Sequence, residues 1–234
     1  MISTEVKFGS VSSTTDLNLI FTHAVIGTPE VRMEYVEVPG RSPVDLSELM
    51  LGKPQYNMRE ITVEFEYKGL DWADEMALVF AKLHGRKMDI RFLTDPSWYY
   101  TGRCIVTVEP NLSTLHFTVT ITADPFKRVY NELPTTLAAP GNVVNPTLYD
   151  SSPLIRVNGT GAGTLTVGNN TVTLDAIDGY VDIDSELMDC YKGLVNCNGD
   201  VTMSEFPTLA PGTNAITWSG GVTSVVVTGR WHTL

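Results

Sequence analysis

The segment from Phe117 to Val129 constrains the fold of this chain more than any other stretch, because an alternating pattern ends abruptly at a proline. Apolar residues and threonines alternate in the order Phe117, Thr118, Val119, Thr120, Ile121, Thr122. A period of two is typical of a β-strand with one buried face. Pro125 cannot donate a ladder hydrogen bond, so the strand is expected to end there.

The amino-acid composition indicates that β-structure predominates in the whole chain. Charged residues make up 18% of the 234 residues, and glycine and proline contribute 19 and 13 residues, which favours a mainly β protein with many turns. The net charge of −11 argues against binding to nucleic acid or to an anionic membrane surface. We find neither a signal-peptide pattern nor an apolar run of membrane-spanning length, so we expect synthesis in the cytoplasm.

The character of the sequence changes near Pro134. Lysine and arginine number 13 in residues 1–134 but only 3 in residues 135–234. Residues 134–146 contain three prolines and no charge, which is typical of a connector. The sequence therefore predicts a first domain at residues 1–133, a linker at 134–146 and a second domain at 147–234, with each domain folding independently.

The first domain is predicted to contain strands and one helix. Strands are expected at Val31–Val38 and Arg59–Tyr67. They are separated by a polar excursion, Pro39–Asn57, that is too long for a tight turn and suits an arm reaching a partner. A helix is expected to begin near Asp71 and to stop at Gly85. Its apolar stripe is Trp72, Met76, Val79, Phe80 and Leu83. Two further strands, Met88–Leu93 and Gly102–Val108, should flank an aromatic turn at residues 95–100.

The second domain is expected to be a β-sandwich of jelly-roll type without helices. Its clearest short strands are Leu154–Val157, Thr164–Val167, Thr171–Leu174, Tyr180–Ile183, Ala215–Trp218 and Ser224–Thr228. Gly168-Asn169-Asn170 is predicted to form a tight turn between two of them.

No motif predicts a catalytic site, a cofactor site or a metal site. Nucleophile, phosphate-binding and zinc-protease patterns are missing from the sequence, and Cys104, Cys190 and Cys197 are expected to be reduced thiols. Asp182, Asp184 and Glu186 should share one side of a strand, where solvent or a cation must accommodate them. A solvated face is the default, with a calcium site or a glycosidase carboxylate pair as alternatives.

Three aromatic residues of the second domain could stack on sugar rings, although packing in the core is the simpler interpretation for at least two of them. They are Tyr191, Trp218 and Trp231.

Several short segments, in order and spacing, make the chain resemble the distal tail protein (Dit) family of long-tailed, non-contractile bacteriophages and related prophages. The resemblance covers the whole chain. The matching segments are Phe8-Gly9, Val11-Ser12-Ser13, Val38-Pro39-Gly40-Arg41, residues 95–103, 123–127, 152–159, 180–186 and 206–214, and Arg230-Trp231.

This resemblance implies a structural virion protein without enzymatic activity. It implies a hexameric ring at the tail tip that joins the tail tube protein to the tail-associated tip protein. The first domain would be a tail-tube-like β-barrel with one helix, and the second a galectin-like or carbohydrate-module-like sandwich. The arm would contact neighbouring subunits through Val38, Pro39, Gly40, Arg41, Lys53 and Tyr56. The alternative is a carbohydrate-binding module that recognises host cell-surface polysaccharide, and a receptor-binding protein is a further candidate partner.

Overall fold

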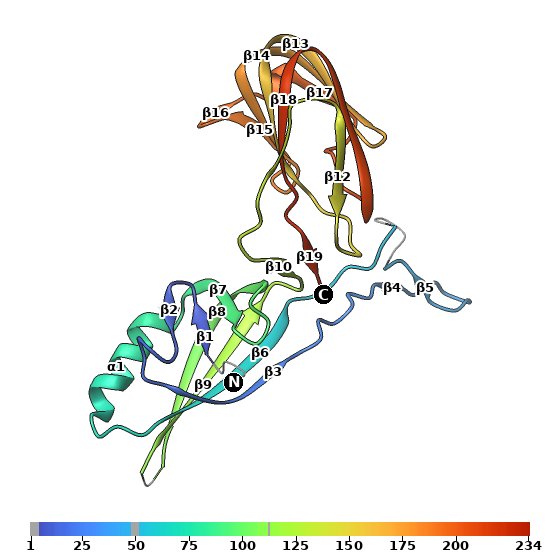
Figure 1. Cartoon of the computed structure of the whole chain (residues 1–234). Coiled ribbons are helices and arrows are strands. Elements are labelled where there is room, and N and C mark those ends of the chain that lie inside the picture. The colour runs from blue at the N-terminus through green and yellow to red at the C-terminus, as the bar shows by residue number, and fades with distance from the viewer. Residues whose placement is uncertain (1–4, 48–51, 112) are drawn as a thin grey trace. The chain divides into compact units, whose positions relative to one another are not determined.

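The computed structural model describes residues 5–47, 52–111 and 113–234. The chain divides into two compact units, residues 1–130 with Leu234, and residues 131–233 (Figure 1). Strands dominate both units, which confirms the expected mainly β fold. The described residues contain one α-helix, α1 (Trp72–Leu83), and one short 3₁₀ turn, Asn198–Asp200.

The first unit is built on one antiparallel sheet with the strand order β2-β1-β7-β8-β9-β6-β3. The strands of this unit are β1 (Val6–Phe8), β2 (Val11–Ser12), β3 (Ile20–Ile26), β4 (Tyr35–Val36), β5 (Val44–Asp45), β6 (Arg59–Tyr67), β7 (Lys87–Phe92), β8 (Trp98–Pro110), β9 (Leu115–Ala123) and β10 (Lys127–Val129). Strand β9 ends before Asp124-Pro125, and β6 has the predicted bounds, so both sequence predictions are confirmed.

Alternation along the central strands builds the core of the first unit. Every second residue of β6 and β9 is buried, and these side chains pack beneath α1. The helical stripe is confirmed: Val79 and Leu83 are buried, and the other three apolar residues pack partly buried against the same core. Asp71 precedes the helix, but its carboxylate makes no capping bond and instead accepts a hydrogen bond from the Tyr67 hydroxyl.

Two predictions for the first unit are wrong. The expected strand Val31–Val38 is reduced to the two residues of β4 and an isolated bridge between Val31 and Tyr56, because no neighbouring sheet pairs with it in the described chain. The expected aromatic turn is shorter than predicted, since Trp98, Tyr99 and Tyr100 already belong to β8.

The second unit is also a β structure around its own core, with the strand order β11-β18-β13-β14-β15-β16. Its strands are β11 (Thr135–Leu137), β12 (Gly141–Asn145), β13 (Leu154–Val167), β14 (Asn170–Asp184), β15 (Asp189–Lys192), β16 (Val195–Asn196), β17 (Val201–Met203), β18 (Gly212–Thr228) and β19 (His232–Thr233). The tight turn predicted at Gly168-Asn169 joins β13 to β14, with Val167 opposite Asn170.

The six short strands predicted for this unit are joined in pairs into β13, β14 and β18. The pairing of β13 with β14 and β18 shifts register at Gly159, Gly161 and Gly163, and all three strands are curved (Figure 1). A Cβ atom on Gly159 would lie 2.2 Å from the carbonyl oxygen of Gly221, so the backbones approach more closely than a side chain allows. Glycine therefore bends these strands instead of ending them.

Residues 134–146, expected to be a linker, carry two strands of the second unit. Strands β11 and β12 both pair with β18, and Val143 and Asn145 are buried. Asn145 donates hydrogen bonds to the carbonyl oxygens of Tyr149 (2.9 Å) and Leu209 (3.0 Å). The prolines in this segment lie outside both strands, so they do not interrupt the ladder.

Candidate functional sites

Residues 31–57 of the first unit, which include the predicted arm Pro39–Asn57 and are together called the arm below, expose apolar side chains in their described parts, 31–47 and 52–57. The two legs of the arm are held together at the base by hydrogen bonds from Arg32 N to Gln55 O (2.7 Å) and from Asn57 N to Glu30 O (2.8 Å). Beyond the base, β4 pairs with β5. Met33 and Tyr35 are 64% and 57% exposed, and Val31 and Val36 are also largely in solvent. Exposed apolar side chains grouped on one segment are characteristic of a contact surface.

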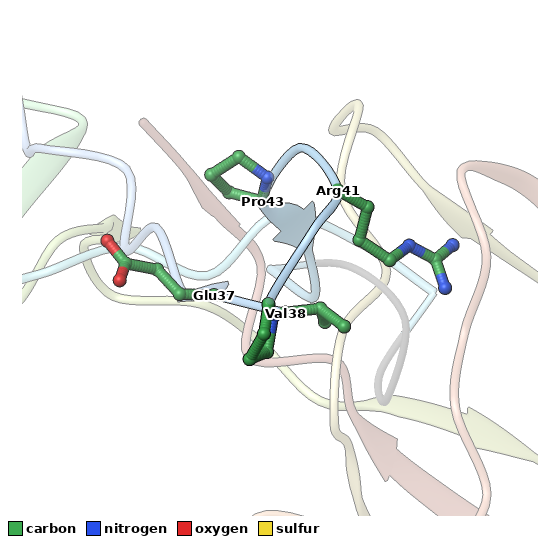
Figure 2. A pocket seen from close by; sticks show the side chains of 5 residues that line it. Glu37, Val38, Arg41 and Pro43 are labelled. Carbon is green, nitrogen blue, oxygen red and sulfur yellow. The ribbon is translucent and has the colours of Figure 1, made fainter.

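A shallow hollow of about 430 Å³ lies beside the turn of the arm, and Figure 2 shows Glu37 and Arg41 extending in opposite directions from it. The lining residues are Glu37, Val38, Pro39, Arg41 and Pro43. Gly40 forms the turn between them with φ +79°, a backbone conformation that favours glycine.

The structure gathers only part of the predicted ring-contact set. Val38, Pro39 and Arg41 line the hollow, and Gly40 shapes it. Lys53 is exposed elsewhere on the arm. Tyr56 is partly buried at the base of the arm, where its ring meets Phe126 edge-on with the centroids 5.7 Å apart. That position suits Tyr56 for anchoring the arm.

The second unit carries a polar face, which we define as the side of β13, β14, β15 and β18 opposite its core. Arg156 lies across from Asp182, which lies across from Tyr191, while Asn158 lies between Tyr180 and Ser224. Directly paired residues point to the same side of a sheet, and so do residues two apart on one strand. These six side chains therefore share one face.

Arg156 and Asp182 form the first ion pair of the polar face. The Nε and Nη2 atoms of Arg156 donate to the two carboxylate oxygens of Asp182 at 2.7 and 2.8 Å. The guanidinium lies over the ring of Tyr180, 4.3 Å from its centroid. The hydrogen bonds to Asp182 raise the pKa of Arg156 above its ordinary value. Two bonds and a ring contact fix the orientation of this side chain.

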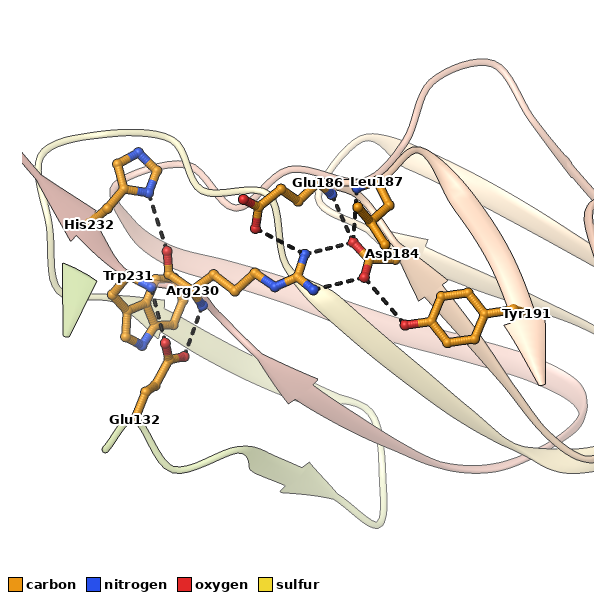
Figure 3. A network of polar contacts seen from close by, with 8 residues as sticks. All are labelled: Glu132, Asp184, Glu186, Leu187, Tyr191, Arg230, Trp231 and His232. Atoms are coloured by element: carbon orange, nitrogen blue, oxygen red, sulfur yellow. Dashed lines mark hydrogen bonds and ion pairs between the residues drawn. The ribbon is translucent and has the colours of Figure 1, made fainter. Parts of the chain in front are cut away.

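Asp184 is the centre of a second polar network (Figure 3). Its carboxylate accepts hydrogen bonds from Nη1 and Nη2 of Arg230 at 2.6 and 2.7 Å, and one from the Tyr191 hydroxyl at 3.3 Å. It also accepts from the backbone N–H groups of Glu186 (3.1 Å) and Leu187 (3.0 Å). Burial alone would raise the pKa of Asp184, but the bonds from Arg230 and these N–H groups outweigh it, so its pKa lies below the ordinary value.

The same network ties both ends of the second unit together. The carboxylate of Glu132 accepts hydrogen bonds from the backbone N–H groups of Arg230 (3.0 Å) and Trp231 (3.1 Å), as Figure 3 shows. Arg230 adopts φ +55°, a conformation that is unusual for a residue other than glycine. Its backbone and its side chain are thus held by two different carboxylates.

The prediction that the carboxylates of β14 form a solvated face is wrong. Asp182 and Asp184 are only 4% and 1% exposed, and arginine side chains of the protein provide the compensating positive charge. Glu186 is exposed and lies 3.3 Å from Arg230. Among the described residues, no group of three or more histidine, cysteine, aspartate or glutamate side chains is placed to hold a metal ion.

The three candidate sugar-contacting aromatics occupy different surroundings. Tyr191 lies on the polar face and is partly buried. Trp218 and Trp231 are partly buried against the hydrophobic core of the second unit. Only Tyr191 therefore belongs to the polar face.

Sequence reasoning missed the two arginines that pair with Asp182 and Asp184. Arg156 and Arg230 lie 26 and 46 residues from the aspartates they bind, so local spacing does not reveal the pairs. The available signal was the scarcity of basic residues: residues 135–234 contain three, and all three pair with aspartates of β14.

Two smaller expectations concern the cysteines and membrane-spanning segments. All three cysteines are free thiols, as predicted, and burial raises the pKa of Cys104 and Cys190 to about 11. Within the described parts of the chain, the structure contains no helix long and apolar enough to cross a membrane.

Comparison with known proteins shows similarity to solved structures and not to known sequences. No protein-family profile matches the sequence, and no curated protein matches it. Among solved structures, the chain is similar in fold to the Dit protein (gp 19.1) of phage SPP1, described as a paradigm of the hub adsorption apparatus in phages that infect Gram-positive bacteria. The TM-score is 0.75 at 14% sequence identity, over 98% of this chain and 99% of the SPP1 chain.

Proposed function

We propose that this chain is a structural hub protein of a bacteriophage tail. The observation that carries the proposal is the similarity to the SPP1 hub protein, which extends over both units. Fold alone does not determine function. A match that extends through two different β units in one chain is, however, more specific than a match to a single unit. In this role the protein belongs to the virion, is made in the host cytoplasm and catalyses no reaction.

We further propose that six copies form a ring at the distal tip of the tail. The ring joins the tail tube protein on one side to a tail-associated tip protein on the other. An arm that exposes apolar side chains supports this assembly, because a neighbouring copy would cover them. A head-to-tail contact repeated by a closing rotation produces a ring and not a filament.

The test is the mass of the protein in solution, measured by light scattering together with negative-stain images. We expect a six-fold particle for the intact chain. A variant lacking residues 42–54 should be a folded monomer, because the deletion removes β5, which pairs with β4 in the arm. A deletion variant that keeps the native mass would exclude residues 42–54 as the ring contact. A monomeric intact chain, even at high concentration, would contradict a self-assembling ring.

A further inference from the structure

We propose that Cys190 and Cys197 are a modification site, at which reaction with a small-molecule disulfide closes an intramolecular disulfide bond. Cys190 lies on β15 and Cys197 directly follows β16, and these two strands form an antiparallel hairpin. The setting of the reaction rests on the proposed function, because a virion protein is made in the reducing cytoplasm and later enters an oxidising medium. The bond itself depends only on the geometry of the hairpin.

The first argument is the register of the hairpin. Tyr191 lies opposite Asn196, so the next pair along the hairpin is Cys190 with Cys197. The backbone N–H of Cys197 donates to the carbonyl oxygen of Cys190 at 2.7 Å, as this register requires. The Cα atoms of such a hydrogen-bonded pair lie about 5.5 Å apart, and a disulfide spans about 4.4–6.8 Å between Cα atoms.

The two thiols also lie on the same side of the hairpin. Residues directly opposite one another on antiparallel strands project from one face of the sheet. Cys190 is buried in the core of the second unit, and Cys197 packs partly buried against that core. Burial, the charge of Asp189 and the Cys197 thiol together raise the pKa of Cys190 to about 11. The two thiols are therefore close enough to influence each other electrostatically.

Hydrogen bonds around the pair hold the hairpin in this register. Asn198 Oδ1 accepts from the backbone N–H of Cys190 at 2.7 Å, and Asn198 Nδ2 donates to Asp189 Oδ1 at 2.7 Å. Asn196 Nδ2 donates to the same carboxylate oxygen at 3.1 Å. The polar side chains on either side of the two cysteines thus fix their backbone, and a bond between the sulfur atoms needs little backbone movement.

Thiol–disulfide exchange with oxidised glutathione gives a balanced reaction. The Cys197 thiolate attacks one glutathione sulfur, which forms a mixed disulfide and releases one glutathione thiolate. The Cys190 thiolate then attacks the Cys197 sulfur and releases the second glutathione thiolate. The protein gives up two electrons and two thiol protons, which convert one glutathione disulfide into two glutathione thiols. Cys197 reacts first because its side chain is partly exposed, whereas Cys190 is buried.

The bond links an edge of the sheet covalently to its neighbouring strand. β16 is the last strand in the order of the second unit, and Leu194 and Val195 are largely in solvent. Segments with few buried apolar contacts open more easily than the core of a protein. Closing the disulfide joins β16 to β15 and prevents this local opening.

The test exposes the full, folded chain to oxidised glutathione at about pH 8, where free thiols are partly ionised. Mass spectrometry of the intact chain should show the loss of two hydrogen atoms, and a digest should contain one peptide pair linked through Cys190 and Cys197. Cys104 is buried in the first unit and should stay reduced. A chain that keeps all its thiols, or a disulfide that includes Cys104, would overturn the proposal.

Single substitutions test the order of attack. Cys190→Ser should retain one glutathione on Cys197, because no second thiol resolves the mixed disulfide. Cys197→Ser should leave the buried Cys190 unmodified. Cys104→Ser is the matched control and should form the internal bond like the unaltered chain. Uptake of glutathione by Cys197→Ser to the same extent as by Cys190→Ser would show that the proposed order is wrong.

The melting temperature reports whether the bond restrains the hairpin. The oxidised chain should melt about 4 °C or more above the reduced chain, because the bond restricts the unfolded state, and Cys190→Ser should show no such rise. Equal melting temperatures would contradict the restraint of β16. The mass in solution separates this inference from the hub proposal. If the ring forms but no disulfide closes, only this inference fails, whereas a disulfide in a monomeric chain contradicts the ring alone.

Discussion

The arm and the segment 134–146 both contain short strands but differ in what lies beside them. In the arm, β4 and β5 pair with one another and leave Met33 and Tyr35 in solvent. In the segment 134–146, β11 and β12 add to the long strand β18 and bury Val143. A two-stranded ribbon is marginally stable alone, whereas a strand added to a sheet gains a complete ladder. The second segment thus completes its own unit, while the arm is suited to a surface on another molecule.

The largest effect should follow from removing the segment 134–146. A fragment of residues 131–234 retains β11 and β12 and is expected to melt cooperatively. A fragment of residues 147–234 lacks both strands, leaves an edge of β18 unpaired and removes Val143 from the core, so it should show no cooperative transition. Circular dichroism of the two fragments on heating measures the difference. Equal melting curves would mean that these strands contribute little and behave as the linker that the sequence suggests.

The next largest effect on stability should come from breaking an ion pair of the second unit, and breaking an ion pair of the arm should cost much less. Arg230→Ala leaves the buried carboxylate of Asp184 without its main partner, and such losses typically cost about 3 kcal/mol or more. Arg32→Ala breaks an exposed pair in the arm, Arg32–Glu34 at 3.4 Å, and should cost less than about 0.5 kcal/mol. Urea unfolding followed by tryptophan fluorescence measures both. Similar losses would show that burial does not distinguish the two pairs.

The change in stability with pH that comes from the Asp184 network should be smaller than the loss caused by Arg230→Ala. The pKa of Asp184 is lowered in the folded chain, so its contribution to stability is present above the ordinary aspartate pKa of 3.8. It is lost as the pH falls through the lower pKa of the folded state. Unfolding midpoints between pH 6 and pH 2 should therefore fall more steeply for the unaltered protein than for Asp184→Asn. Parallel curves would contradict a lowered pKa.

The sequence predicts elements with a strong internal pattern and fails where partners are distant. Strands β6 and β9 and helix α1 were predictable because every second residue, or every third to fourth, is apolar. Strands β11 and β12 have little pattern of their own and exist because β18 pairs with them. Glycines such as Gly159 suggested strand ends, although the close approach of Gly221 makes them bends.

The candidate sites also differ in whether the local sequence or distant partners determine them. The turn of the arm was predictable from Val38-Pro39-Gly40-Arg41, since proline and glycine fix its geometry locally. The ion pairs of the second unit were not predictable, because Arg156 and Arg230 bind aspartates of β14 that lie far from them in the sequence. The run of carboxylates along β14 suggested a face exposed to solvent. In the structure, guanidinium groups bind these carboxylates instead.

The smallest effect on stability should come from the arm itself. Met33→Asp combined with Tyr35→Asp places charge on side chains that are already exposed, so the free energy of unfolding should change by no more than about 0.5 kcal/mol. Burying two carboxylates in a contact between copies would be costly, and the proposed ring should therefore dissociate. The measurement pairs light scattering with a urea unfolding curve of the same sample.

A matched control separates the arm contact from a general effect of charge. Thr171→Asp with Thr173→Asp adds the same two charges on exposed residues of β14 in the second unit and should leave the ring intact. If the arm variant loses stability as well as mass, its apolar side chains support the fold of the first unit, and the contrast with the segment 134–146 disappears. If it keeps the six-fold mass, these side chains lie outside the contact between copies, and the proposed role of the arm is wrong.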